Sequence, residues 1–157
     1  MSKLAQYHFS TLAENPQLFE EVIALVEKEF HYTHEYSYLD DFYLLMNPLN
    51  FENCLIAIDT NTNTVAAHVA FCKRELIKGT HTLPIVMIGG IATNAQHKKQ
   101  GLFRELMNQV IAKNKNSTAL YMLWSEITGL YEKFNFYLSG GLIQTGNSFF
   151  DETKKPV

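Results

Sequence analysis

Apolar side chains recur along this chain at two different spacings, and the changes between them mark the expected elements. Residues 5–11 form an expected first strand. After Pro16, apolar residues recur every three or four positions as far as Phe30, which predicts an amphipathic helix because this spacing gathers them on one face. Residues 54–59 (CLIAID) and 65–74 (VAAHVAFCKR) are typical of strands, the second by its period of two, and NTNT between them predicts a hairpin turn.

The second half of the chain predicts a strand–helix–strand unit. Residues 83–93 (LPIVMIGGIAT) are an almost continuous apolar run, as expected of a central strand covered on both faces, and Gly89 and Gly90 inside it indicate a bulge or a close backbone approach. A parallel pair joined by a helix, at about residues 83–124, and the hairpins before it make the expected sheet mixed. The remaining expected elements are a helix over residues 101–113, a second buried strand over 118–124, a short helix that Ser125 caps and that carries Ile127, Leu130, Tyr131 and Phe134 on one face, and short strands around 136–143 and 147–150.

Length, charge and composition limit the class of protein. The 157 residues suit one domain over positions 1–157, and 46% hydrophobic residues exclude disorder. A net charge of −3 argues against nucleic acid as a partner, because proteins that bind polyanions usually carry a basic face. No stretch suits a signal peptide or a membrane span, so we expect a cytoplasmic protein with no membrane partner. Cys54 and Cys72 lie in apolar runs, which suits reduced thiols better than the alternative of one disulfide.

The densest basic cluster lies in NAQHKKQGLFRELM, residues 94–107, at the start of the helix expected over 101–113. The first amides of a helix have no partner within it, and together with the helix dipole and nearby cations they bind anions such as phosphate or pyrophosphate. Lys98 and Lys99 supply positive charge, and Gly101 allows the backbone to come close to a ligand. The alternative is a solvated basic turn. Such turns are common before helices, and the loop considered by itself favours this alternative.

Two motifs resemble those of the GNAT superfamily, the N-acetyltransferases that use acetyl-CoA. TNAQHKKQGLF at residues 93–103 is similar to the family's loop between its fourth strand and the next helix, and YEKFNF at 131–136 is similar to its Y-E-K-x-G-F motif. The resemblance implies an α/β fold (α+β in some schemes) with a mixed, mostly antiparallel central sheet flanked by helices, and acetyl-CoA as co-substrate. The departures from the family pattern are Lys98 for arginine or glutamine, Lys99 and Phe103 for small residues, Trp124 for asparagine, and Asn135 for glycine.

The same resemblance implies roles for particular residues. Amides at the end of the expected strand would hold the pantetheine arm and the thioester carbonyl, and amides of the loop would hold the pyrophosphate. Tyr131 would protonate the departing thiolate, although its place on an apolar stripe equally suits a core aromatic residue. The implied cofactor-binding residues are Ile91, Ala92, Thr93, Lys98, Lys99, Gln100, Gly101, Leu102 and Phe103.

No single residue stands out as the general base, for which Glu126, His68 and Asp41 are candidates. Glu126 also suits stabilisation of a helix N-terminus, and His68 suits a structural role in a strand. The histidines have no neighbouring cluster of metal ligands, so we expect no metal. The tyrosine-rich stretch at residues 31–47 is expected to be partly helical, and it suits either binding of a cationic amine or simple cover of the core. Its acceptor candidates are Tyr32, Glu35, Tyr36 and Asp41.

These observations favour an N-acetyltransferase that moves an acetyl group from acetyl-CoA directly to a primary amine, which is a small amine, an amino sugar or a peptide amine. A non-catalytic acyl-CoA-binding or sensing module on the same fold is the alternative, which Phe103, Trp124 and Asn135 motivate. A regulatory domain that recognises phosphate through the basic loop is a third reading. The resemblance also allows a homodimer.

Overall fold

The structure is a computed structural model of the chain and describes residues 4–33, 35–125, 127 and 129–139. The chain divides into two compact units, residues 1–125 and 126–157, which we describe separately. Among the described residues, every strand and every α-helix belongs to the first unit. The organisation of residues 1–157 as one domain stays a prediction.

A five-stranded sheet in the order β1-β2-β3-β4-β5 forms the first unit's centre. Neighbouring strands pair antiparallel from β1 to β4, and β5 runs parallel to β4. The predicted mixed, mostly antiparallel sheet is therefore confirmed. The strands are β1 (Tyr7–Thr11), β2 (Cys54–Asp59), β3 (Thr64–Lys78), β4 (His81–Thr93) and β5 (Leu120–Met122).

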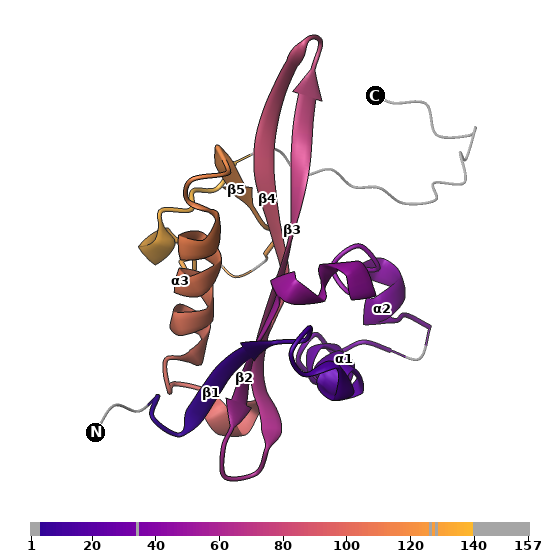
Figure 1. Cartoon of the computed structure of the whole chain (residues 1–157), viewed down its shortest axis with the longest axis vertical. Helices are drawn as coiled ribbons and strands as arrows, with labels where there is room; N and C mark the ends of the chain where they lie inside the picture. The colour runs from indigo at the N-terminus through magenta and orange to yellow at the C-terminus, as the bar shows by residue number, and fades with distance from the viewer. Residues whose placement is uncertain (1–3, 34, 126, 128, 140–157) are drawn as a thin grey trace, which may run out of the picture. The chain divides into compact units, whose positions relative to one another are not determined.

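Helices cover both faces of this sheet (Figure 1). The helices α1 (Phe19–Glu29) and α2 (Tyr38–Asp41) lie on one face, and α3 (Leu102–Asn114) lies on the other. The three- and four-residue spacing of their apolar side chains places these on one stripe of α1 and of α3, as predicted. The buried apolar residues of the two longer helices are Val22, Leu25 and Val26 of α1, and Leu102, Leu106, Met107 and Val110 of α3.

The hairpin of β3 and β4 extends well beyond its neighbours. Its turn lies at residues 79–80, and residues 73–84 at this end are exposed, including Leu83. The prediction that residues 83–93 are covered on both faces is therefore wrong for Leu83 and Pro84. The reason is that β2 pairs with β3 only as far as Ala70, and β5 pairs with β4 only from Ile85.

The predicted β-α-β crossover is confirmed, since β4, α3 and β5 follow one another and the two strands pair in parallel. The second strand differs from the prediction. Instead of a buried strand over residues 118–124, β5 has three residues, and Leu120 is 43% exposed. Among the described strands, β5 lies at the edge of the sheet and pairs only with β4, so less of it is covered.

The second unit departs most from the predicted elements. The expected helix with Ile127, Leu130 and Tyr131 on one face is absent from its described residues, which form one 3₁₀ helix, Glu132–Phe134. Gly129 has φ +80°, a left-handed backbone that a right-handed helix does not contain. The strand predicted around 136–143 is absent from residues 136–139, and its remainder and the strand around 147–150 lie outside the described residues.

Two further expectations concern the class of protein. Cys54 and Cys72 are buried free thiols, as predicted. In the described ranges, no helix has the length and apolar character needed to span a membrane.

Candidate functional site

The strand β4 contains the predicted bulge. Gly89 and Ala92 pair with residues of β3, whereas Gly90 and Ile91 between them have no partner there. They stand opposite one residue of β3, Val69, which is the two-against-one count of a β-bulge. Gly90 has φ +60°, a backbone conformation that glycine adopts without the steric cost of a side chain.

The bulged segment of β4 also lacks a partner on its other side. The parallel ladder between β4 and β5 runs from Ile85 to Met87 and ends there. Within the described residues, no strand therefore pairs with Gly90 or Ile91 on either side. This interruption of the pairing on both sides suits a ligand that approaches the backbone at the place where β4 and β5 separate.

Two buried polar side chains meet Gly90. The Nδ1 of His68 lies 2.8 Å from the Gly90 carbonyl oxygen, and because a carbonyl only accepts, Nδ1 carries the hydrogen and Nε2 is an acceptor. A Cβ at position 90 would overlap the Tyr38 hydroxyl oxygen and lie 2.9 Å from Tyr38 Cζ. Within the part of the chain that the structure describes, His68 Nε2 and Tyr38 Oη have no hydrogen-bond partner. The bulge is therefore the meeting point of α2, β3 and β4.

The burial of His68 predicts a loss of stability in acid. Burial lowers its pKa from 6.5 to about 4, although the hydrogen bond to Gly90 opposes the shift. The unfolded chain takes up this proton near pH 6.5, and the folded chain only near pH 4. The stability due to the neutral imidazole is therefore present above pH 6.5 and is lost as the pH falls towards 4. His68→Asn keeps a donor near Nδ1 and cannot titrate. We expect its Tm to depend less steeply on pH between 6.5 and 4, by calorimetry; an equally steep dependence would contradict the assignment.

The basic loop leads from β4 to α3 and is fixed at its start. His97, which ends the 3₁₀ helix Ala95–His97, hydrogen-bonds Tyr7 of β1 through Nδ1 at 3.0 Å. Lys99 has φ +64°, which is uncommon for a residue other than glycine, and Gly101 has φ +94° at the N-cap of α3. Among the described residues, no hydrogen bond involves the backbone amides of Lys98, Lys99, Gly101 and Leu102. The open amides needed for an anion site are thus present.

The two lysines of this loop differ in environment. Lys98 Nζ lies 2.6 Å from Glu29 Oε2 at the end of α1, whereas Lys99 is exposed and forms no ion pair within the described residues. Gln100 is half-buried, Leu102 is buried in the core, and Phe103 is half-buried in the first turn of α3. Lys99 therefore offers the less compensated positive charge.

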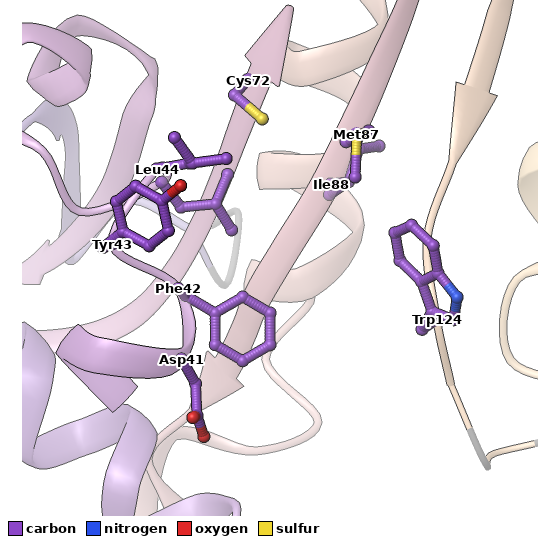
Figure 2. A pocket seen from close by; sticks show the side chains of 9 residues that line it. Asp41, Phe42, Tyr43, Leu44, Cys72, Met87, Ile88 and Trp124 are labelled. Carbon is purple, nitrogen blue, oxygen red and sulfur yellow. The ribbon is translucent and has the colours of Figure 1, made fainter. Parts of the chain in front are cut away.

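A cavity of about 190 Å³ lies on the α2 side of the sheet (Figure 2). Met87 and Ile88 of β4 and Cys72 of β3 contribute to one wall, and Trp124 beyond β5 contributes to another. The segment that follows α2 completes it. Its lining residues are Asp41, Phe42, Tyr43, Leu44, Leu45, Cys72, Met87, Ile88 and Trp124. The cavity directly precedes the bulge on β4, because Gly89 follows Ile88.

The structure brings together three of the four acceptor candidates. Tyr32, Tyr36 and Asp41 line a second, shallower cavity, and Glu35 lines neither cavity. Burial, followed by the neighbouring Asp41 carboxylate, raises the pKa of Tyr32 to about 12. Asp41 belongs to both cavities. The predicted partly helical stretch is confirmed by α2, and Tyr38 inside it is fully buried.

Comparison with known families accounts for this arrangement. The sequence profile of the acetyltransferase (GNAT) domain matches residues 8–139. The chain belongs to the GNAT acetyltransferase family. The family predicted from the loop and from YEKFNF is thus confirmed, and the match covers most of the chain. No curated protein sequence matches this chain.

Solved GNAT-like structures show the same fold. An acetyltransferase from Trypanosoma brucei has a TM-score of 0.67 at 13% identity, over 89% of this chain and 99% of that one. A predicted acetyltransferase with acetyl-CoA from Clostridium acetobutylicum has a TM-score of 0.66 at 13% identity, over 89% and 94%. Glucosamine-6-phosphate N-acetyltransferase from Arabidopsis thaliana has a TM-score of 0.64 at 12% identity, over 91% and 98%. At such identities, these similarities concern the fold alone.

The second GNAT motif lies in the second unit. Tyr131 is half-buried, its carbonyl accepts hydrogen bonds from the amides of Phe134 and Phe136, and its ring lies near that of Phe136. Asn135 has φ +62°, which explains how it replaces the glycine usual in the family, because asparagine tolerates this backbone better than most residues. Glu126, a candidate base, lies outside the described residues. The roles of Tyr131 and Glu126 stay predictions.

Several residues of this GNAT site were not predicted from the sequence. Tyr38 was one of many tyrosines in its stretch, and nothing in the sequence distinguished it as the partner of Gly90. Met87 and Trp124 lie in runs that predict buried strands, yet they line an open cavity; Trp124 was singled out only as a departure from the family pattern. Among the described residues, no group of three or more His, Cys, Asp or Glu side chains is arranged to hold a metal ion.

Proposed function

We propose that this protein is an N-acetyltransferase that moves the acetyl group of acetyl-CoA directly to a primary amine. The observation that carries the proposal is the unpaired Gly90–Ile91 segment, which lies on the strand that leads into the loop with open amides. The unpaired segment suits a thioester carbonyl, and the loop with open amides suits a diphosphate. Acetyl-CoA carries both groups, joined by a pantetheine arm.

The Ile91 N–H is the proposed donor to the thioester oxygen. It belongs to the same peptide unit as the Gly90 carbonyl, and this peptide bond is trans like the others of the described residues, so this N–H points away from His68. The hydrogen bond from His68 to the carbonyl polarises the peptide unit and strengthens its N–H as a donor. One well-placed donor to developing charge contributes about 3–4 kcal/mol to catalysis. His68 is then a positioning residue.

Loop amides and Lys99 are the proposed diphosphate ligands. The dipole of α3 adds to the positive potential at its N-terminus, and Gly101 keeps this end free of a side chain. Transfer then joins the amine nitrogen to the acetyl carbon while the carbon–sulfur bond breaks. The amine loses its proton to solvent through ordered water, the departing thiolate takes one from Tyr131, and Tyr131 regains a proton from solvent.

Thiol release from acetyl-CoA over a panel of amines tests this function, with mass spectrometry of the amine as the second measurement. We expect one thiol for each acetylated amine. Binding of acetyl-CoA without release of thiol with any amine would instead support the alternative of a non-catalytic acyl-CoA sensor. Failure to bind acetyl-CoA would contradict both.

Removal of the Lys99 charge is expected to weaken acetyl-CoA binding. Lys99→Ala should raise the Kd about two- to fivefold, the effect of one exposed ion pair. Lys98→Ala should have a smaller effect, because Glu29 already compensates that charge. Calorimetric titration measures both, with Lys73→Ala on the exposed hairpin as control. An unchanged Kd for Lys99→Ala would remove this residue from the diphosphate site.

A further inference from the structure

We infer that the amine acceptor is a primary ammonium joined by a short linker to an apolar group, preferably an aromatic ring. This inference rests on the proposed function and specifies its second substrate. The observation behind it is the cavity beside the bulge. The chemistry of its walls, its volume and the position of the Asp41 carboxylate each point to this class of acceptor.

The walls that the described residues form are almost entirely carbon. Phe42, Tyr43 and Trp124 present aromatic rings, and Leu44 and Met87 add aliphatic surface (Figure 2). An apolar ligand group gains free energy when such walls remove it from water. A sugar ring would lose hydrogen bonds to water and find few replacements there, which is costly. The lining therefore favours an apolar group over an amino sugar.

The volume of the cavity fits one aromatic ring. A cavity of about 150 Å³ lined by aliphatic and aromatic side chains binds benzene, and this one has about 190 Å³. The difference leaves space for a short linker. A Cβ at position 89, next to the bulge, would contact Phe42 and Leu45 of the lining, so a short linker carries the amine from the cavity towards the proposed thioester site.

Among the described residues that line the cavity, Asp41 is the only one with a charged side chain. Figure 2 shows it at one end of the cavity, beyond Phe42 and away from Cys72 and Met87. A carboxylate at an exposed edge attracts an ammonium group, and the rings beside it add cation–π attraction. The described lining residues include no lysine or arginine to pair with a phosphate or a second carboxylate. A phosphorylated amine or a free amino acid is therefore disfavoured.

A matched panel tests this acceptor class. Phenethylamine carries the ring, and ethanolamine carries the same primary amine without it. Glucosamine 6-phosphate supplies a polar, anionic acceptor, and a peptide with N-terminal phenylalanine tests whether the apolar amine comes from a protein. We expect kcat/KM for phenethylamine or for the peptide to exceed that for ethanolamine about ten- to a hundredfold, the effect of burying one aromatic group.

Variants with matched controls locate the effect in the cavity. Trp124→Ala should lower kcat/KM for the aromatic acceptor at least threefold and leave that for ethanolamine unchanged, whereas Leu49→Ala, at a residue 96% exposed and outside the lining, should change neither. Asp41→Asn should raise KM for the aromatic amine. Asp40→Asn, at the exposed neighbouring residue, should not.

The outcomes separate this inference from the function on which it rests. Faster transfer to ethanolamine or glucosamine 6-phosphate than to both aromatic acceptors would overturn the inference and leave acetyl transfer intact. Equal loss for aromatic and polar amines in Trp124→Ala would also overturn it. No thiol release with any amine, despite binding of acetyl-CoA, would refute the proposed function itself.

Discussion

Replacement of Tyr131 by phenylalanine is expected to lower kcat for acetyl transfer by about 10²–10⁴-fold. The reason is that the hydroxyl is the proposed proton donor to the departing thiolate. The ring itself should stay in place, because Tyr131 is half-buried and its centroid lies 6.2 Å from that of Phe136, a contact that phenylalanine retains. Thiol release measures kcat, while calorimetry should show little change in acetyl-CoA affinity or Tm.

A second tyrosine of the same unit supplies the control. Tyr137 is 80% exposed, so Tyr137→Phe removes a hydroxyl without affecting a packed ring and should keep wild-type kcat. Wild-type kcat in an active Tyr131→Phe preparation would show that this tyrosine is a core residue only.

Gly90→Ala is expected to have the largest effect on stability. The added Cβ would overlap the Tyr38 hydroxyl, and alanine at φ +60° costs about 1–2 kcal/mol by itself. Crowding in a packed interior adds about 1–3 kcal/mol. At roughly 2–4 °C for each kcal/mol in a domain of this size, Tm should fall by roughly 5–15 °C. Thermal unfolding followed by circular dichroism measures it, and kcat should fall because the Ile91 amide is displaced.

Gly79→Ala separates the two contributions. Gly79 has the same φ of +60° in the turn between β3 and β4, but a Cβ there would have no atom within 4 Å. It should therefore show the backbone cost alone. Adding Tyr38→Phe to Gly90→Ala should restore part of the lost Tm, because the overlapping oxygen is removed. Equal losses in Gly79→Ala and Gly90→Ala would show that Tyr38 does not restrict position 90.

Much of the fold could be predicted because its signals are local. The apolar stripe of α3 and the run before it predict a crossover without knowledge of distant residues, and the glycine pair marks the bulge. The short helix predicted around Ile127 failed because Gly129 adopts a left-handed backbone that periodicity does not reveal. The edge position of β5 depends on how many strands assemble beside it, which is a property of the whole sheet.

The candidate site was predictable in its backbone and not in its side chains. The loop and the end of β4 follow from motif and chain order, so Ile91 and Lys99 stand where they are expected. The ion pair of Lys98 with Glu29 joins residues far apart in the sequence, and so does the approach of Tyr38 to Gly90. Such contacts depend on the packing of α1 and α2 on the sheet, for which one sequence contains no direct signal.

The additional residue that the bulge inserts in β4 also determines which face of the sheet each later side chain of this strand points to. Ala92 lies in the hydrophobic cluster formed with α1 and α2, and Met87 packs against the same cluster, although the two are five positions apart, an odd offset that would place them on opposite faces of a regular strand. Deletion of Gly90 would turn Ala92 and its successors through half a rotation, exchanging interior for exterior along the remainder of the strand. The number of residues between the bulge and α3 is thus fixed by the packing. Single-residue insertions or deletions in this segment should be tolerated far less than in the turn at Gly79.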